Sequence, residues 1–479
     1  RIRDRKLDAC RGSGLPTGNE EAIVSARVTG PVAEHGRSLT RNIVHAVIGM
    51  GFYSACQFAV TILLAKFASS QILGDYFFAL AVSTPIILFF GLELRGVFVA
   101  DSQNDFTYGT YEALRRTSLM VAAVLLTGIL IYEAARGARP AFVSFLAAIF
   151  AGKIVWAVGE MGWGVFNRRE RLDLLGVATI LRGVGLVVPY GVILPILHHR
   201  YPEQENILEW GAVAASGLVA LNWLIAYLFF DERARRQRAD LDETWSWEAI
   251  RRLGLRTLPM GLVVMTINLA DSFPRIVIKH LGSAEALGYF GAIVTLTLLG
   301  NLVVVQASNA AANRISLLYR APGPGFARLL LKLIGLALAV GLGMTIILVP
   351  FGEVVMRMLY RPEYAAYQAA LQIVLLAQVI ALLTAVFGVT VTQMRMFWMQ
   401  VPAQVITLGT TAIAALLLIP GQPIRGAATT ALVRALTQFV LYASCLLWGI
   451  IQRARWIPTV DHAVGSNGED DPRENATTC

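Results

Sequence analysis

Twelve long apolar segments, separated by short polar connections, constrain this chain more than any other feature of its sequence. Each segment is near the roughly 20 residues that a helix needs to cross the hydrocarbon core of a bilayer. Hydrophobic residues make up 56% of the chain and charged residues 15%. In a soluble protein about 45–50% of the residues are apolar and about 25% are charged. The sequence therefore predicts an all-α, polytopic integral membrane protein. The predicted spans are 43–67, 74–99, 117–135, 141–166, 174–197, 210–230, 258–280, 286–312, 329–351, 366–391, 397–419 and 427–450.

These spans divide the chain into two sets of six, which we expect to form two six-helix bundles over 42–230 and 258–455. Residues 1–41 are polar and predict a disordered cytoplasmic tail, and residues 456–479 predict a second, acidic cytoplasmic tail. The segment 231–257 is rich in arginine and contains two tryptophans, which is typical of a cytoplasmic linker with an amphipathic helix on the inner leaflet. A plain solvated linker is the alternative. No connection between spans is long enough for a separate soluble catalytic module.

Lysines and arginines flank the predicted spans unevenly. Most of them lie in the connections on the side of the N-terminus, including seven arginines between residues 233 and 256. Because cytoplasmic connections carry the excess of Lys and Arg, both termini are predicted to be cytoplasmic.

The two sets of spans begin with similar sequences. Lys66, Ser70 and Tyr76-Phe77 recur 213 residues later as Lys279, Ser283 and Tyr289-Phe290, and Leu73-Gly74 recurs 214 residues later as Leu287-Gly288. Since six is an even number, both sets point the same way across the membrane. The sequence predicts a parallel repeat about an axis along the membrane normal, as found in transporters with a site at the repeat interface. Convergent loop chemistry is the alternative.

Eight ionisable residues fall inside the predicted spans, where a charge costs at least about 2.5–3.5 kcal/mol. The bases are Arg95, Lys153, Arg182, Arg275 and Arg434, and the acids are Glu93, Glu160 and Asp271. The excess of bases favours a cavity for an anionic passenger, especially one with phosphate, which guanidinium binds in bidentate fashion. The bases are therefore candidate substrate-binding residues, and the acids are candidates for charge balance or ion coupling.

Some of these residues also have a purely structural explanation. Arg95 lies near the inner end of its span and could extend to the lipid phosphates. Lys153 and Glu160 are seven residues apart on nearly the same helix face, so they could neutralise each other.

The remaining bases differ in the acids that the sequence places near them. Asp271 and Arg275 are four residues apart and could pair, although Pro274 between them should kink the helix. Arg182 and Arg434 have no acid one turn away. A structural role inside a bundle is the alternative for both.

Motifs of soluble catalysis are absent from the sequence. There is no G-x-x-x-x-G-K-[ST], H-E-x-x-H or G-x-S-x-G pattern. The four cysteines, Cys10, Cys56, Cys445 and Cys479, have no metal-site or disulfide spacing. We expect no metal, no cofactor and no nucleic-acid partner, and the sequence does not identify a coupling ion.

Two stretches resemble a known family. Leu92-Glu-Leu94-Arg95, followed by Ala100-Asp101 and Tyr111-Glu-Ala-Leu114-Arg115, is similar to the end of the second span and the next loop of bacterial polysaccharide (O-antigen type) flippases. Asp271-Ser-Phe-Pro274-Arg275, leading into Leu281-Gly282 and Leu287-Gly288-Tyr289-Phe290, resembles the first span of their second half. These flippases belong to the multidrug/oligosaccharidyl-lipid/polysaccharide (MOP) exporter superfamily. The layout of residues 42–450 is also similar.

The resemblance implies a V-shaped pair of six-helix bundles around a central cationic cavity that opens alternately to either side. It implies translocation of an undecaprenyl-pyrophosphate-linked oligosaccharide across the bacterial inner (cytoplasmic) membrane, for surface polysaccharides such as the O-antigen of lipopolysaccharide. Arg95 and Arg275 occupy motif positions, whereas Lys153, Arg182 and Arg434 are added by the burial argument alone. The implied partners are the lipid-linked oligosaccharide, membrane lipids and other polysaccharide-assembly proteins.

Two other functions remain open from the sequence. A cation-coupled drug exporter of the same superfamily would favour a cavity dominated by acids. A membrane-embedded polysaccharide polymerase or ligase would need a long external loop with catalytic residues, and no predicted connection is long enough.

Overall fold

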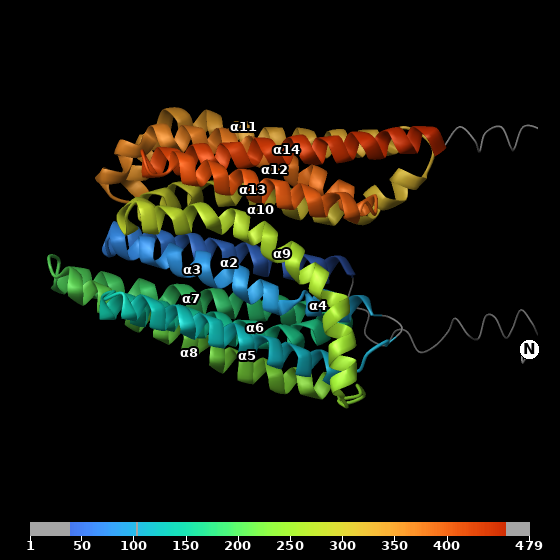
Figure 1. Ribbon diagram of the computed structural model, residues 1–479, viewed down its shortest axis with the longest axis horizontal. Coiled ribbons are helices and arrows are strands. Elements are labelled where there is room, and N and C mark those ends of the chain that lie inside the picture. The colour runs from blue at the N-terminus through green and yellow to red at the C-terminus, as the bar shows by residue number, and fades with distance from the viewer. Residues whose placement is uncertain (1–38, 102–103, 457–479) are drawn as a thin grey trace, which may run out of the picture. The chain divides into compact units, whose positions relative to one another are not determined.

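The computed structural model describes residues 39–101 and 104–456, and every regular element in these ranges is helical (Figure 1). The prediction of an all-α protein is confirmed. The tails up to residue 38 and from residue 457 lie outside the described residues. The elements are α2 (Leu39–Phe67), α3 (Ser70–Gly91), α4 (Leu94–Ala100), α5 (Tyr108–Ala135), α6 (Pro140–Arg168), α7 (Leu172–Arg200), α8 (Glu205–Gln237), α9 (Trp247–Leu281), α10 (Ala284–Arg320), α11 (Gly325–Leu359), the 3-10 helix η1 (Pro362–Tyr367), α12 (Gln368–Gln393), α13 (Phe397–Leu418) and α14 (Pro423–Trp456).

Within the described ranges, eleven helices are long and apolar enough to cross a membrane. The helix α10 adds a twelfth span if its two parts, bent by 43° between Leu298 and Gly300, are counted as one. The chain is therefore a multi-pass membrane protein, as its hydropathy predicts. Apolar side chains such as Val124, Ile346 and Leu417 are 70–74% exposed in the isolated chain, as expected for helices that face lipid.

Three differences from the predicted layout affect the tail, the second span and the linker. The first helix begins at Leu39, within the predicted tail 1–41. The predicted span 74–99 is broken into α3 and α4 at Leu92 and Glu93. Most of the predicted linker 231–257 continues α8 or α9, so that only Arg238–Ser246 is not helical.

From His45 onward the described helices pack as one compact unit. We call α2–α8 the N-half and α9–α14 the C-half. In the N-half α8 packs on α6 and α7, and in the C-half α12 and α13 pack on α14. The halves meet mainly where α3 packs against α9 and α10 (Figure 1). We call the end of the helices that carries the α2–α3 and α9–α10 connections the outer end, after the predicted orientation, and the opposite end the inner end.

Two glycines allow α3 and α10 to approach each other at the outer end. A Cβ on Gly288 would lie 1.9 Å from the carbonyl oxygen of Ser70, and a Cβ on Gly74 would lie 1.8 Å from that of Ala284. The contact is reciprocal, because the first residue of each helix packs on the glycine of the other, as at a two-fold axis. This arrangement agrees with the predicted parallel repeat.

The helix caps define the register of the repeat. Ser69 caps α3 by accepting a hydrogen bond from the N–H of Ile72, and Ser283 caps α10 in the same way from Ala286. The two caps are 214 residues apart, as are Gly74 and Gly288. Ser69 is therefore the structural counterpart of Ser283, and the pairing of Ser70 with Ser283 by sequence was wrong by one residue.

We expect Gly288→Ala to destabilise the protein by about 1–3 kcal/mol, because the added methyl would overlap backbone atoms that cannot move aside. Gly74→Ala should have a similar effect if the contact is symmetric. Gly128→Ala is the matched control, since its Cβ would meet no atom within 4 Å. Thermal stability of the detergent-solubilised variants, followed by fluorescence-detected size-exclusion chromatography, measures the difference. Equal stability of Gly288→Ala and Gly128→Ala would contradict the close contact.

Candidate functional site

The break between α3 and α4 places Arg95 on its own short helix. Leu92 and Glu93 both have left-handed backbone conformations, with φ of 50° and 51°. Such a conformation costs roughly 1–2 kcal/mol for each L-residue with a Cβ. Strain of this kind is kept where the surrounding structure enforces it, and it is concentrated at functional sites.

Arg115 on α5 enforces the break. Its Nη1 donates 2.8 Å to the carbonyl of Gly91, the last residue of α3, which has no partner within its own helix. Its Nε and Nη2 donate 2.9 and 2.8 Å to the carbonyl of Ala157 on α6, and Nη2 also forms an ion pair with Glu160. The side chain of Arg115 is only 3% exposed. It therefore ties α3, α5 and α6 together at the start of the break.

Asp101 fixes the far end of α4. Its carboxylate accepts hydrogen bonds from the Tyr111 hydroxyl at 3.0 Å and from the N–H groups of Asp105 and Phe106 at 3.0 and 3.4 Å. Burial alone would raise the pKa of Asp101, but these hydrogen bonds and the charge of Arg168 lower it below its usual range. The carboxylate is therefore ionised at neutral pH, and α4 is held at both ends.

Arg115 and Asp101, which both belong to the first stretch that resembles the flippases, thus hold the short helix that carries Arg95. The Cγ of Arg95 lies 3.5 Å from the position of a Cβ on Gly164 of α6, so its stem packs between helices while the residue stays half-buried. No carboxylate in the described part of the chain forms an ion pair with it. Glu93, the other candidate in this segment, is exposed and likewise forms no ion pair there.

The pairing of Lys153 with Glu160 allowed by their spacing was wrong. Glu160 pairs with Arg115, which reaches it from a neighbouring helix. Lys153 instead lies in the wall of a small cavity in the N-half, with Tyr53, Tyr76 and the buried Tyr190. The residues lining this cavity include no acid.

Arg182 on α7 is enclosed by aromatic rings. Its guanidinium carbon lies 4.0 Å from the ring centre of Trp156, 4.1 Å from Tyr53 and 4.8 Å from Trp223. Its Nε is buried without a hydrogen-bond partner among the described residues. Cation–π contacts stabilise this buried charge without neutralising it, so its field remains available to an anion.

A cleft between the halves, lined by both polar and apolar side chains, adjoins the cavity that contains Lys153. It has a volume of about 180 Å³ and is lined by Ser54 and Gln57 of α2 and by Asn301 and Gln306 of α10. Gln57 also lines the cavity that contains Lys153. The cleft and the cavity therefore share Gln57 of α2 in their walls.

The second family-like stretch lies on α9. Asp271 forms an ion pair with Arg434 of α14, so its pairing with Arg275 allowed by their spacing was wrong. Arg275 forms no ion pair with a described carboxylate, and its guanidinium carbon lies 5.9 Å from the ring centre of Phe77 on α3. Arg275 is therefore the candidate that lies where the two halves meet.

These groups lie deep along their helices. Gln57 and Asp271 are each ten residues from the outer end of their helix, which is about 15 Å at a rise of roughly 1.5 Å per residue. That depth is half of the roughly 30 Å hydrocarbon thickness. The structure does not gather all five candidate bases: Lys153 and Arg182 lie inside the N-half, Arg275 and Arg434 are in the C-half, and Arg95 lies near the inner end.

A buried acid at the outer end was missing from the predicted site. Asp75 has a side chain 4% exposed and forms ion pairs with Lys279 of the C-half and, at 3.0 Å, with Arg139. Arg139 also forms an ion pair with Glu209. Asp75 is the second residue of the predicted span 74–99, so its sequence position suggests a residue at the membrane surface. Only the packing of α3 against α9 shows that it is enclosed.

Comparison with known proteins agrees with this architecture, although no family model matches the chain. The chain is 21% identical over 411 residues to the capsular polysaccharide biosynthesis protein CapF of Staphylococcus aureus, covering 85% of this chain and 98% of that protein. Among solved structures, the lipid II flippase MurJ in an inward closed conformation superposes with a TM-score of 0.65 and 8% identity, over 89% of this chain and 94% of that chain.

Transporters of the MOP superfamily are similar as well. An inward-facing multidrug resistance transporter of the MATE family superposes with a TM-score of 0.60 and 14% identity, over 88% of this chain and 100% of that chain. A MOP transporter from Pyrococcus furiosus, described for the reverse polarity of its binding pocket, superposes with a TM-score of 0.59 and 14% identity. The match covers 87% of this chain and 95% of that chain. The chain therefore shares its fold with these solved MOP transporters, as the resemblance drawn from the sequence implies. Over 85% of its length the chain is also similar to a capsular polysaccharide biosynthesis protein.

Proposed function

We propose that this protein is a flippase for a lipid-linked oligosaccharide, with undecaprenyl pyrophosphate as the lipid carrier, in the inner membrane of a bacterium. Its product would enter surface polysaccharide such as capsule or O-antigen, with both termini in the cytoplasm. The support is the family-like sequence stretches, the similarity to CapF and the fold shared with MurJ.

Uncompensated positive charge in the membrane-spanning region carries this proposal. Among the described residues, no carboxylate forms an ion pair with Arg95, Lys153, Arg182 or Arg275, whereas Asp271 and Glu160 are each paired with an arginine. A cation at this depth is costly unless it has a partner. A pyrophosphate would supply that partner during transport, and guanidinium groups bind phosphate oxygens with favourable geometry.

The same pattern argues against a cation-coupled drug exporter. Such a protein needs unpaired acids inside its cavity. Of the three candidate acids within the predicted spans, Asp271 and Glu160 are each paired with an arginine, and Glu93, unpaired among the described residues, is exposed at the break before α4. We therefore do not propose drug export.

The contacts between the halves support alternating access with the outer end closed. Lys279 of the C-half reaches Asp75 of the N-half. Arg361 at the start of η1 donates to the carbonyls of Lys66, at 3.2 Å, and Ala68, at 2.5 Å, at the end of α2. These polar contacts and the glycine contact of α3 with α10 hold the halves together on one side of the candidate site. Opening on that side requires them to separate.

We expect Asp75→Asn to increase the opening of the halves at the outer end about tenfold. The substitution removes the negative charge that binds both Lys279 and Arg139, and these two bases then repel each other. The measurement is the rate at which an impermeant maleimide labels Ser70→Cys, beside the glycine contact, in a chain without other cysteines. Glu353→Gln is the matched control, since it breaks an exposed pair with Arg357 at the same end. An unchanged labelling rate in Asp75→Asn would show that the network does not hold the halves together.

Reconstituted transport tests the function directly. In proteoliposomes, wild-type protein should move a fluorescent polyprenyl-pyrophosphate disaccharide between leaflets, and a neutral polyprenyl disaccharide should move at the rate of empty liposomes. Lys153→Ala and Arg182→Gln should each slow transport about tenfold, as expected for the loss of roughly one charge-assisted contact of about 1.5 kcal/mol. Transport no faster than in protein-free liposomes would reject the proposal.

A matched control separates the site from the general charge of the protein. Arg236 is an exposed arginine of α8 that pairs with Glu232. Arg236→Gln should leave the transport rate unchanged. If it slows transport as much as Arg182→Gln, the two internal bases do not form a specific site.

A further inference from the structure

A third, larger pocket lies at the inner end of the N-half, and none of the five candidate bases lines it. Its volume is about 560 Å³, and it is enclosed by α5, the end of α8 and the connection that leads to α9. Its charged lining consists of Glu112, Arg116, Arg235, Arg238 and Glu243, and Trp245 and Trp247 also line it. None of these residues belongs to the proposed transport site.

The wall of this pocket is fixed by hydrogen bonds. The N–H of Gly109 donates 3.1 Å to the carbonyl of Asp242, and the Thr107 hydroxyl donates 2.5 Å to that of Thr244. Arg238, whose side chain is 6% exposed, donates 2.7 Å to the hydroxyl of Tyr108. The connection is therefore held against the start of α5, and the pocket is a preformed part of the fold.

Charges of both signs line the pocket. Arg116 and Arg235 pair with Glu112 and Asp231 on their own helices, but their side chains are 54% and 58% exposed, so their guanidinium groups can also reach a ligand. Glu243 is 62% exposed and lies 3.2 Å from Arg238. Glu112 is already held by Arg116 and Arg238. A ligand with one phosphate and one ammonium matches this arrangement better than a purely anionic or a purely cationic ligand.

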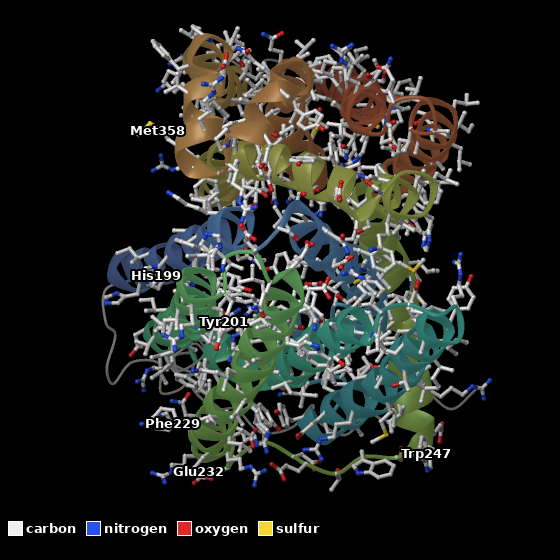
Figure 2. The ribbon with its side chains drawn as sticks, turned by 90° about the vertical axis from the view of Figure 1, so that its left-hand side faces the viewer. His199, Tyr201, Phe229, Glu232, Trp247 and Met358 are labelled. Carbon is white, nitrogen blue, oxygen red and sulfur yellow. The ribbon has the colours of Figure 1, made fainter. Side chains whose placement is uncertain are left out.

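The two tryptophans give the pocket an aromatic side at the level expected for a membrane surface. The rings of Trp245 and Trp247 meet edge to face, with centres 5.5 Å apart, and both side chains are more than half exposed. Tryptophan is enriched at membrane–water interfaces, and its ring face attracts ammonium groups. Figure 2 shows Trp247 at the edge of the molecule, like Phe229 and Glu232 of α8, on the side away from Met358 of α11.

An apolar helix face continues from the pocket toward the middle of the membrane. Met120 lines the pocket and is 65% exposed, and Val124, Gly128 and Ile131 follow on the same face of α5, all exposed. Their spacing of three or four residues forms one continuous strip along the helix. A headgroup in the pocket would leave its acyl chains along this strip.

We propose that this pocket binds the headgroup of a zwitterionic phospholipid with a primary ammonium, of the phosphatidylethanolamine type. Its phosphate binds Arg116 and Arg235, and its ammonium binds Glu243 and the tryptophan rings. Its acyl chains lie along the apolar face of α5. The proposal does not depend on the transported substrate.

Native mass spectrometry of the purified full-length protein tests the site with phosphatidylethanolamine, phosphatidylglycerol and phosphatidylcholine of equal chain length. We expect phosphatidylethanolamine to be retained at least tenfold better than the other two. Arg116→Ala combined with Arg235→Ala should reduce its retention about tenfold. Glu243→Gln should reduce retention of phosphatidylethanolamine without affecting phosphatidylglycerol. Arg236→Ala, next to Arg235 but outside the pocket, should bind as wild type does.

Several results would overturn the proposal. Preferred retention of phosphatidylglycerol would indicate a simple anion site, and equal retention of phosphatidylcholine would show that a primary ammonium is not recognised. Displacement by millimolar inorganic phosphate would indicate a soluble anion instead of a lipid. Unchanged binding in the double arginine variant, with a wild-type elution profile, would place the lipid elsewhere. Because no oligosaccharide is present, failure here is independent of failure of the flippase assay.

Discussion

Charge reversal of Arg275 to Glu is expected to abolish surface polysaccharide in the native host while the protein remains inserted and abundant. Arg275 lies where α9 meets α3, near Phe77, and no described carboxylate pairs with it. A glutamate there would face Asp271 one turn away and repel a pyrophosphate instead of binding it. We expect transport in proteoliposomes to fall at least 100-fold. Arg275→Lys keeps the charge but loses the bidentate geometry. Its transport rate should lie between those of wild type and Arg275→Glu.

The fold should survive this change, because removal of Arg275 leaves no paired acid without its partner. Arg425→Glu is the control, since it reverses an exposed arginine in the same half at the outer end of α14. It should support normal polymer. Normal polymer from Arg275→Glu, at wild-type protein abundance, would remove Arg275 from the transport site.

Arg115→Ala is expected to destabilise the protein by about 3–5 kcal/mol, the cost of breaking a buried charge pair by removing one partner. The substitution leaves Glu160 without its base and removes the donors for the carbonyls of Gly91 and Ala157. The loss should appear as a much lower yield of monodisperse protein and a lower midpoint in thermal unfolding. A stability equal to that of wild type would show that Arg115 does not hold the break before α4.

A double variant distinguishes loss of the charge pair from loss of packing. Arg115→Met combined with Glu160→Gln removes both charges and keeps most of the volume, so it should recover part of the lost stability. Arg116→Ala, the next residue on α5, has an exposed side chain in a pair with Glu112. It should cost no more than about 1 kcal/mol.

Hydropathy predicted the membrane spans because each lipid-facing helix must be apolar over a fixed length. Breaks within a helix follow a different rule. The break at Leu92 and Glu93 follows Gly91, but a single glycine is not enough to predict it, and Arg115, more than twenty residues later, binds the carbonyl that the break exposes. A local sequence pattern cannot show a partner that arrives from another helix.

The sequence identified most residues of the candidate site, but it did not identify their ion-pair partners. The buried bases were identified because a charge in a span needs an explanation. Their partners were assigned from neighbours on the same helix, whereas Asp271 pairs with Arg434 on α14 and Glu160 pairs with Arg115 on α5. Arg115 lies two residues before the predicted span 117–135, so its sequence position indicates only a charge that flanks a span. Contacts between helices depend on rotation and tilt, which hydropathy does not determine.

The path of α9 has a consequence for how the halves move. Its first turns belong to the N-half core, where Ile250 and Leu253 are buried against α5, while its later turns pack against α13. The preceding connection is hydrogen-bonded to α5, so it offers little freedom. Rocking of one half against the other must then be absorbed inside the helix, and Pro259 is the natural hinge, because it leaves the carbonyl of Leu255 without its helical hydrogen bond. The start of α9 would thus stay fixed to the N-half, while the same helix bends at Pro259 when the halves move.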